Sequence, residues 1–250
     1  MDRISLNEAR KLFFSSDAKY VSQEQSYIYY DNFSGGVALD TYMTCGCLAV
    51  KSGSDWHIHA ISTESDISSA IEEVTGFMDA DTEKLMVLTW NSIPEELTDK
   101  RGAYKLAREY LPYSDQSIRQ LTKNDYEYVR KCCSYDSDDN KIGQNIADEF
   151  LTYYDDFMND TNTINLGLFI DNSLVGFVQS FKQKDCGIST INIYVTRTQR
   201  KKGYAKRLLS AICATTENMV YCYSCVKTNI ASFNTAKSCG FQFKGAYLSI

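Results

Sequence analysis

One run of the chain, Val195 to Leu209, constrains the fold more than any other stretch. It joins a β-rich stretch, Ser189 to Val195, to a segment in which Leu208 and Ile212 recur at helical spacing. The turn between the two contains Gly203, where a backbone can approach a ligand closely. A strand that passes through such a turn into a helix leaves N–H donors unpaired at the positive end of the helix dipole. The run therefore predicts a site for a phosphate or pyrophosphate.

The same turn is cationic within an acidic chain. No Asp or Glu occurs from Cys186 to Thr216, although the whole chain carries a net charge of -6. The local charge thus has the sign that attracts a phosphate. The cationic side chains are Arg197, Arg200, Lys201, Lys202, Lys206 and Arg207.

At these residues the sequence resembles a known family. Arg200-x-x-Gly203-x-Ala205, five residues after a strand-ending valine, looks like the acyl-CoA pyrophosphate loop of GNAT-type N-acetyltransferases. The similarity covers roughly residues 117–250 and does not extend to 1–116. Three further stretches follow the family in order and spacing: a strand and first helix at 118–129, a hairpin around Asp171-Asn172, and Asn229-x-x-Ser232 followed by Gly240-Phe241.

The resemblance implies an α+β fold, in which a GNAT-like mixed, mostly antiparallel sheet is flanked by helices and preceded by an α+β N-terminal domain. It also implies acetyl-CoA as cosubstrate. The pantetheine amides would pair with the strand backbone, as an added strand pairs with a sheet edge. Asn229 can equally cap the helix that follows it. The residues expected to contact CoA are Ile193, Val195, Arg200, Lys201, Lys202, Gly203, Tyr204, Ala205, Lys206, Asn229 and Ser232.

The catalytic acid and base cannot be assigned from the resemblance. Many members of the family place a tyrosine four residues before the Gly-Phe pair, where this chain has Ala236. The strand position that often holds a carboxylate base is Ser189. Acetyl transfer still needs a deprotonated amine and a proton for the leaving thiolate. The substitutes, none singled out by its spacing, are Glu149 and Asp148 on the second helix, and Tyr223 and Tyr221 on a core strand.

Turn residues divide the chain near 112–117, which predicts an N-terminal α+β domain over 1–114 and a GNAT-like domain over 115–250. The N-terminal part carries net charge -9 over residues 1–116, against +3 for the remainder. No internal repeat is evident in the sequence. The N-terminal part should contain helices at 5–14, 65–78 and 99–110, and strands at 27–33, 36–50, 56–61 and 84–90.

The C-terminal part shows the order β, α, α, β, β, β, α, β, α, β. Most of this order follows from hydrophobic periodicity alone, and all of it agrees with the resemblance. The expected ranges are 118–121, 123–133, 142–158, 164–170, 174–183, 189–196, 204–217, 219–226, 230–239 and 241–248.

Three groups of possible metal ligands deserve a test, although no metal is expected. Cys45-x-Cys47 and His57-x-His59 lie on neighbouring predicted strands and would suit Zn²⁺ only if their faces coincided. Cys222-x-x-Cys225 lies in a predicted strand, where residues three apart point to opposite faces. The stretch from Asp136 to Asn140 lacks the glycine and the glutamate that complete a calcium loop.

The chain has no apolar N-terminal leader and no apolar run long enough to span a membrane, so a cytoplasmic protein is expected. Its nine cysteines, an odd number without a secretion signal, predict reduced thiols. The oligomeric state stays open between a monomer and a homodimer.

The function predicted from these features is acetyl-CoA-dependent N-acetyl transfer to a primary amine of a small molecule, with no nucleic-acid or membrane partner. The acidic N-terminal part fits a cationic acceptor, or it only confers solubility. Two alternatives remain: a non-catalytic acyl-CoA-binding sensor, and an aminoacyl or peptidyl transferase of the tandem GNAT-like type. The acidic half speaks against tRNA, whose phosphates need a basic surface.

Overall fold

A computed structural model describes residues 1–16, 39–79, 81–90, 92–134, 141–183 and 187–250. The predicted strand at 27–33 and the calcium-like stretch from Asp136 to Asn140 lie outside these residues. The chain divides into two compact units, each built from segments that are distant in sequence. Unit 1 consists of Met1–Ala107, Ser224–Phe233 and Gln242–Ile250, and unit 2 of Arg108–Tyr223 and Asn234–Phe241.

Unit 1 contains a sheet whose strands follow the order β1-β2-β3-β4-β5-β12-β6. Neighbours are antiparallel except β4 and β5, which are parallel and connected by a helix. The strands are β1 (Asp2–Arg3), β2 (Leu39–Thr44), β3 (Cys47–Ser52), β4 (Asp55–Ala60), β5 (Lys84–Trp90), β6 (Arg101–Glu109) and β12 (Gln242–Ser249). Its helical segments are α1 (Leu6–Ser15), α2 (Ile67–Thr75) and the short η3 (Glu95–Leu97).

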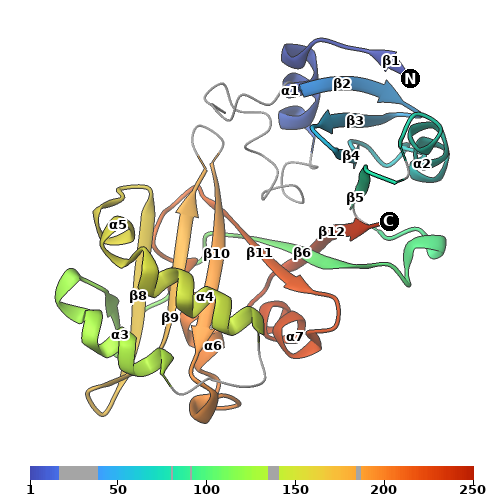
Figure 1. The fold of residues 1–250 in the computed structure, drawn as a ribbon. Coiled ribbons are helices and arrows are strands. Elements are labelled where there is room, and N and C mark those ends of the chain that lie inside the picture. The colour runs from blue at the N-terminus through green and yellow to red at the C-terminus, as the bar shows by residue number, and fades with distance from the viewer. Residues whose placement is uncertain (17–38, 80, 91, 135–140, 184–186) are drawn as a thin grey trace. The chain divides into compact units, whose positions relative to one another are not determined.

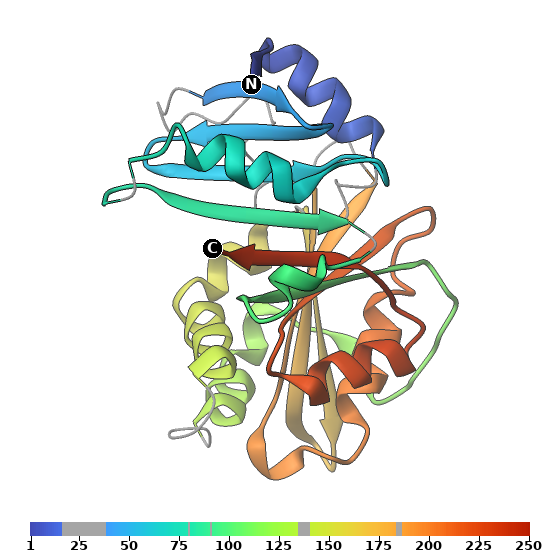
Figure 2. The ribbon, with the colours of Figure 1, turned by 90° about the vertical axis from the view of Figure 1, so that its right-hand side faces the viewer.

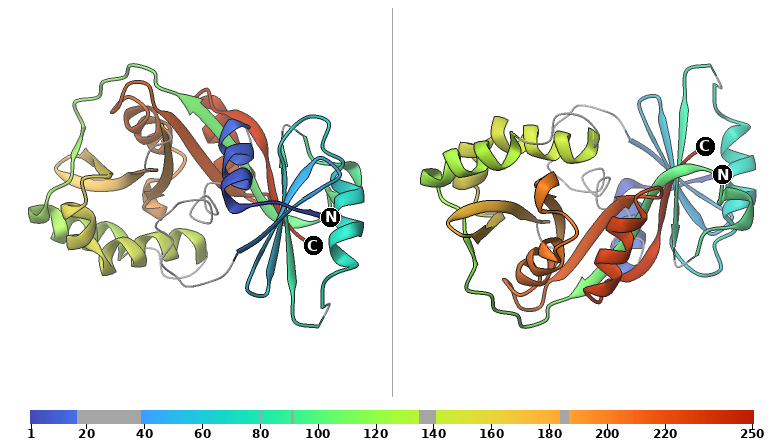
Figure 3. Two further views of the ribbon diagram at one scale, coloured as in Figure 1. Left: turned by 90° about the horizontal axis from the view of Figure 1, so that it is seen from above. Right: turned by 90° about the horizontal axis from the view of Figure 1, so that it is seen from below.

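The sheet of unit 1 is covered on both faces, with α1 on one side and α2 on the other (Figure 3). On the α1 face, Phe13 packs with Leu48 and Val50. On the α2 face, a larger core includes Trp56 and Val74. Helix α2 lies along the strands that it covers (Figure 2). Alternation along β3 directs apolar side chains to both cores, because successive side chains of a strand point to opposite faces.

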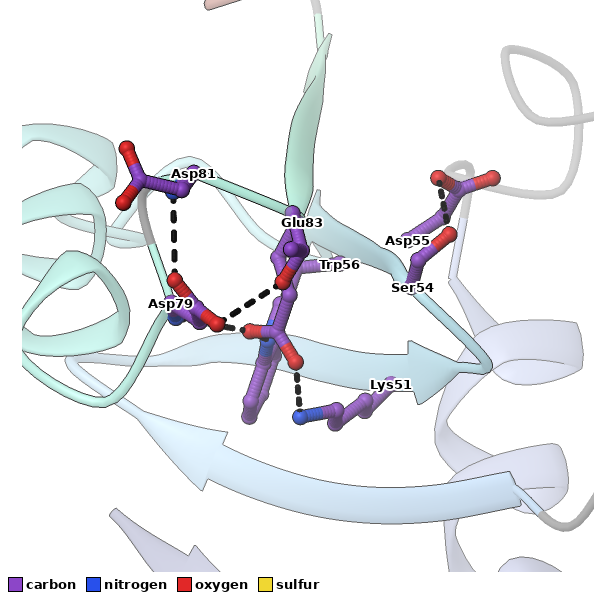
Figure 4. Close-up of polar contacts among 8 residues, drawn as sticks. Lys51, Ser54, Asp55, Trp56, Asp79, Asp81 and Glu83 are labelled. Atoms are coloured by element: carbon purple, nitrogen blue, oxygen red, sulfur yellow. Dashed lines mark hydrogen bonds and ion pairs between the residues drawn. The ribbon is translucent and has the colours of Figure 1, made fainter.

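The carboxylate of Glu83, directly before β5, connects two strands of unit 1 to the turn that precedes β5 (Figure 4). Glu83 accepts a hydrogen bond from Trp56 Nε1 at 2.8 Å and forms an ion pair with Lys51. It also accepts the backbone N–H of Asp79 at 3.2 Å. The hydrogen bond from the Lys51 ammonium is the largest cause that lowers the pKa of Glu83 below its ordinary value. The carboxylate thus joins β3, β4 and the turn before β5.

Unit 2 contains the strands in the order β11-β10-β9-β8-β7, although β11 belongs to unit 1 from Ser224 onward. Among these described neighbours, β10 and β11 are parallel and the other pairs are antiparallel. Helices α3 and α4 cover one face of β8–β10, and α6 lies on the other (Figure 1). The strands are β7 (Ile118–Gln120), β8 (Thr163–Ile170), β9 (Ser173–Lys182), β10 (Ile188–Val195) and β11 (Val220–Val226). The helices are η4 (Lys123–Asp125), α3 (Tyr126–Cys133), α4 (Lys141–Thr152), α5 (Tyr154–Asn159), η5 (Arg197–Gln199) and α6 (Tyr204–Ile212). Helix α7 (Ile230–Ser238) begins in unit 1 and belongs to unit 2 from Asn234 onward.

The two units share one topology. In unit 1, β2, β3 and β4 are antiparallel neighbours, and α2 connects β4 to its parallel partner β5. In unit 2, β8, β9 and β10 are antiparallel neighbours, and α6 connects β10 to its parallel partner β11. The sequence shows no repeat, so the common order of elements is visible in the structure alone.

The C-terminal strand belongs to unit 1. β12 pairs with β5 from Gly245↔Trp90 to Ser249↔Met86, and with β6 on its other side. The units are therefore discontinuous in sequence, whereas a single cut between 114 and 115 was predicted. The α+β fold with a mixed, mostly antiparallel sheet is confirmed. The assignment of separate roles to 1–114 and 115–250 stays a prediction.

Two predicted elements of the N-terminal part are wrong. The helix expected over 99–110 is strand β6. Ala103, Leu106, Ala107 and Tyr110 recur at helical spacing, but pairing with β12 outweighs this local pattern. A Cβ at Gly102 would lie 2.0 Å from the backbone oxygen of Tyr247, so the glycine permits the close strand approach. The single strand expected over 36–50 is a hairpin, β2 and β3, reversed at Thr44–Cys47.

Candidate active site

The last residues of β10 have one strand neighbour instead of two. β10 pairs with β9 up to Val195↔Gly176, but with β11 only from Ile188↔Val220 to Ile191↔Tyr223. The even-numbered residues of β10 direct their backbone polar groups toward β9, because the N–H of Thr196 donates to Val175 O at 3.1 Å. Ile193 and Val195 therefore direct theirs to the other side. Among the described residues, β11 has no register partner for them.

The turn after β10 leaves the first N–H groups of α6 without a side-chain cap. Gly203 is the N-cap, at φ 79° and ψ 3°, and lacks a side chain that could accept a hydrogen bond. A Cβ built on Gly203 would meet no described atom within 4 Å, so the space beside the turn is open. Lys201 also adopts positive φ, at 62°. The first intrahelical bond starts at the N–H of Arg207, which leaves the N–H groups of Tyr204, Ala205 and Lys206 without helical partners.

The loop cations have different surroundings. Arg200 Nε donates to the carbonyl oxygen of Val195 at 3.0 Å, which ties the loop to the end of β10. Lys202 Nζ donates to Gln199 Oε1 at 2.8 Å and remains exposed. Lys201 and Lys206 are exposed. The turn thus combines free N–H donors, a helix dipole and several exposed positive charges, a combination that can bind a phosphate or pyrophosphate.

Neither usual catalytic position can carry out proton transfer here. Ser189 is fully buried on β10, and its hydroxyl forms a hydrogen bond with that of Ser180. Ala236 is fully buried in α7 and has no titratable group. Both departures noted in the sequence are thus interior positions.

The substitute residues differ in accessibility. Glu149 is exposed to solvent on α4. Tyr223 is 7% exposed, with its ring centroid 5.9 Å from that of Phe241. Tyr221 is 1% exposed, and its hydroxyl is engaged by Thr215 and by the backbone of Thr216. Tyr221 is therefore a structural residue.

The downstream residues expected to contact CoA lie in unit 1, not in unit 2 with the loop. The side-chain oxygen of Asn229 accepts the N–H of Ser232 at 3.1 Å, so Asn229 caps α7. Of the two roles left open for Asn229, the structure contains the capping role. Contact of either residue with CoA stays a prediction.

The equivalent turn in unit 1 has the opposite chemistry. The N-cap of α2 is Asp66, whose carboxylate accepts the N–H of Ser69 at 3.1 Å and its hydroxyl at 2.7 Å. A cavity of about 310 Å³ adjoins this helix start, and the described residues that line it include no Lys or Arg. The carboxylate of Asp66 therefore occupies the place that a bound phosphate would take at an uncapped helix.

The proposed zinc ligands lie on opposite faces of the unit 1 sheet. Cys47 is paired with Ala60 and packs in the core beneath α2. His59 is paired with Leu48, and its ring lies 5.8 Å from that of Phe13 on the α1 face. Cys45 lies in the turn between β2 and β3 instead of on a strand. The register therefore excludes a joint site for the thiols and the imidazoles.

The remaining cysteines behave as core residues. Cys213 is fully buried, and burial raises the pKa of its thiol to about 12. Burial likewise raises the pKa of Cys225 to about 11. Such thiols stay protonated and are poor nucleophiles. All the cysteines that the structure describes are free thiols.

One residue of this region was not identified from the sequence. Asp115 forms a bidentate ion pair with Arg207, the last cation of the Val195–Leu209 run. It lies within residues 112–117, which were interpreted only as a boundary between domains. A single acid separated by 92 residues from its partner leaves no local signal in the sequence.

Comparisons with known proteins agree with this geometry. The model of the acetyltransferase (GNAT) family matches residues 116–241. No curated protein matches the chain. Within the described ranges, every helix is too short or too polar to cross a membrane.

Similar solved structures span the whole chain at low sequence identity. An acetyltransferase of the GNAT family from Colwellia psychrerythraea has a TM-score of 0.58 and 11% identity, over 100% of this chain and 98% of its own. A GCN5-related N-acetyltransferase from Sphaerobacter thermophilus has a TM-score of 0.52 and 11% sequence identity, over 99% of this chain and 93% of its own. A tandem GNAT protein from the clavulanic acid biosynthesis pathway has a TM-score of 0.50 and 10% sequence identity, over 100% of this chain and 97% of its own.

At these identities the solved structures are evidence of the fold alone, whereas the family model covers half of the chain. The matched residues include β10, the cationic turn and α6. The chain belongs to the acetyltransferase (GNAT) family.

Proposed function

We propose that this chain is an acetyl-CoA-dependent N-acetyltransferase that acetylates a primary amine of a small molecule. The observation that carries the proposal is the start of α6. Gly203 leaves three N–H groups uncapped beside an open space, and the exposed Lys201, Lys202 and Lys206 surround them. These donors fit the pyrophosphate of CoA in charge and in hydrogen-bonding capacity.

The backbone of β10 supports the orientation of the cosubstrate. Ile193 directs its N–H and C=O groups away from β9, and Val195 directs its N–H the same way, so the pantetheine amides can pair with them as an added strand. The carbonyl oxygen of Val195 already accepts from Arg200 Nε. Such pairing would hold the thioester in one orientation. Backbone N–H groups that point at the carbonyl stabilise the charge that develops during attack by the amine.

The chemistry then depends mainly on positioning. The amine attacks the thioester carbon directly, the C–S bond breaks, and the thiolate of CoA leaves. One proton is lost from the amine and one is gained by the thiolate. Because Ser189 and Ala236 cannot move these protons, Glu149 is proposed as the base and Tyr223 as the acid.

The decisive experiment measures acetyl-CoA turnover with a panel of primary amines. The readout is the free thiol of CoA that each reaction releases. Glu149→Gln and Tyr223→Phe should each lower kcat by about 100-fold, the typical contribution of a general acid or base. CoA affinity measured by calorimetry should be unchanged in both. If each variant turns over like the parent, these two residues do not transfer the protons.

A non-catalytic acyl-CoA sensor is the second candidate. The observation in its favour is that the two usual catalytic positions hold a buried, hydrogen-bonded serine and a buried alanine, Ser189 and Ala236. A sensor would bind acetyl-CoA with measurable affinity and release no thiol with any amine in the panel. Turnover with a single amine would reject it.

A further inference from the structure

The ion pair between Arg207 and Asp115 joins the cationic turn to a distant part of unit 2. Arg207 Nε lies 2.6 Å from Asp115 Oδ2, and its terminal nitrogen lies 2.8 Å from Oδ1. The side chains are 29% and 12% exposed, respectively. A bidentate pair of this kind fixes the orientation of both groups as well as their separation. Arg207 is therefore committed to a carboxylate of its own chain.

Asp115 is itself held by its neighbours. Its Oδ1 accepts the N–H of Ser117 at 3.0 Å, and its Oδ2 accepts the hydroxyl of Tyr113 at 3.2 Å. Hydrogen bonds from Arg207, the largest cause, lower the pKa of Asp115 to about 2. The carboxylate thus stays ionised and fixed under all ordinary assay conditions.

The segment that carries Asp115 is fastened near both ends of α6. The N–H of Leu111 donates to the carbonyl of Cys213, directly after the helix, at 3.3 Å. The pair with Arg207 holds the first turn of the helix. Residues 111–115 therefore run beside α6 and restrain the position of its start.

A carboxylate near a phosphate site is unfavourable unless it has another role, because like charges repel. Here the repulsion is offset by the guanidinium, and the gain is a fixed helix start. The N–H groups of Tyr204, Ala205 and Lys206 can bind a phosphate only if they are held at the right place, since small displacements lose much of such binding energy.

We propose that Asp115 is a positioning residue for the pyrophosphate of CoA, which acts by holding Arg207 and thereby the start of α6. The inference rests on the proposed function, since it requires that this turn binds CoA. The alternative for the same contacts is that Arg207 is a phosphate ligand that Asp115 holds back. The two roles predict opposite changes in CoA affinity. Loss of the Asp115 charge weakens CoA binding if Asp115 positions the helix start, and strengthens it if Asp115 holds back a phosphate ligand.

The test is Asp115→Asn, which removes the charge and keeps the shape. We expect the Kd for CoA by calorimetry, and the KM for acetyl-CoA, to rise about tenfold while kcat stays within about twofold, as a loss of positioning predicts. Asp115→Glu should recover most of the affinity because it restores the ion pair. Arg207→Lys keeps the charge but not the bidentate geometry, so it should also weaken CoA binding. It replaces Asp115→Asn as the test of positioning if Asp115→Asn does not fold.

The matched control is Asp125→Asn. Asp125 forms the same kind of bidentate pair with Arg119 in unit 2, at 2.6 and 2.9 Å, but at the start of α3. Both variants should lower the melting temperature, but only Asp115→Asn should change the affinity for CoA. Equal or tighter CoA binding in Asp115→Asn would overturn the positioning role. If the unaltered protein does not bind CoA at all, it is the proposed function that fails.

Discussion

At the scale of single residues, Gly203 decides whether the turn after β10 can receive an anion. Gly203→Asp would place a carboxylate beside the uncapped N–H groups and supply the cap that the chain lacks. We expect CoA affinity to fall at least 100-fold, by analogy with the strong distance dependence of charge repulsion. Calorimetric titration with CoA measures the effect.

Gly53→Asp is the matched control for this variant. Gly53 also has positive φ, at 61°, and open space around its would-be Cβ, but it lies in the turn between β3 and β4 of unit 1. Both variants carry the same backbone cost and the same added charge. An unchanged Kd in Gly203→Asp would remove the loop from the binding site.

The two histidines of the chain predict how stability depends on pH. His57 is 4% exposed, and its Nδ1 has no hydrogen-bond partner among the described residues. Burial lowers its pKa to about 4. Burial also lowers the pKa of His59. Because the unfolded state binds these protons below pH 6.5 and the folded state does not, stability should fall as the pH decreases from 6.5 toward 4. The slope should reach about 1.4 kcal/mol per pH unit for each histidine.

Urea unfolding at pH 7 and pH 5 measures this slope. His57→Gln should reduce it, since glutamine binds no proton in the unfolded chain, while His59 keeps part of the effect. If the variant and the parent lose the same free energy between the two pH values, His57 does not titrate in the predicted way.

The sequence predicts the geometry of the turn well, because that geometry is local. The run from Arg200 to Lys206 identifies itself by charge and by Gly203, and the structure leaves its N–H groups uncapped as expected. Asp115 could not be found in this way, because its role depends on a partner 92 residues away. Cys47 and His59 fail as joint ligands because their faces depend on strand register, which composition does not reveal.

At the scale of elements, α2 and α6 occupy equivalent positions in the two units but begin differently. Asp66 caps α2 with its own carboxylate, whereas α6 begins at an uncapped glycine. We therefore expect one CoA per chain by calorimetry. Asp66→Ala should lower the free energy of unfolding by about 1 kcal/mol, the usual cost of losing an N-cap.

CoA binding by Asp66→Ala should be unaffected, in contrast to its stability. The stoichiometry and Kd should be unchanged in Asp66→Ala, because the cap belongs to unit 1. A second CoA bound to the unaltered chain, or a loss of affinity in the variant, would show that the turn before α2 takes part in cosubstrate binding.

Most elements of unit 2 could be predicted, because amphipathic periods of two and 3.6 alternate there with clear turn residues. The single helix expected over 142–158 is two helices, α4 and α5. β6 was mistaken for a helix for a physical reason. Its residues Lys105 to Arg108 are all buried, so the two-residue alternation of a half-exposed strand is absent. Only the partner strand β12, more than a hundred residues later, decides its conformation.

At the scale of the whole molecule, the uneven charge makes a prediction about the acceptor. Residues 1–116 carry net charge -9 and the remainder +3. If the acidic part attracts a cationic amine, the KM for that amine should rise with ionic strength, because salt screens charge attraction over about 10 Å at 0.1 M. A neutral amine of similar size is the control, and its KM should stay flat.

The charge of the best acceptor in the panel, and the salt dependence of its KM, decide whether the acidic part attracts the acceptor. A best acceptor that is anionic, or a KM for a cationic acceptor that does not change between low and high salt, would leave the acidic part as a solubilising surface. The assignment to the acetyltransferase (GNAT) family would not be affected.

The duplicated topology entered the sequence analysis only through the tandem GNAT-like alternative, because the two units share their order of elements but not their motifs. Asp66 stands where unit 2 has Gly203, so a search for a second pyrophosphate loop finds nothing. The resemblance therefore stops near residue 117, although the fold does not. Pairing patterns such as Ser249↔Met86 are set by contacts across the chain and leave no local trace.

The placement of β12 between β5 and β6 has a consequence for biosynthesis. A ribosome makes residues 1–107 long before it makes Gln242–Ser249, so the nascent N-terminal segment must wait with the inner edges of β5 and β6 unpaired. Unpaired strand edges recruit other chains. Slow translation of the last third of the message, or a stall within it, should therefore favour aggregation, and chaperones that shield strand edges should matter most in that interval.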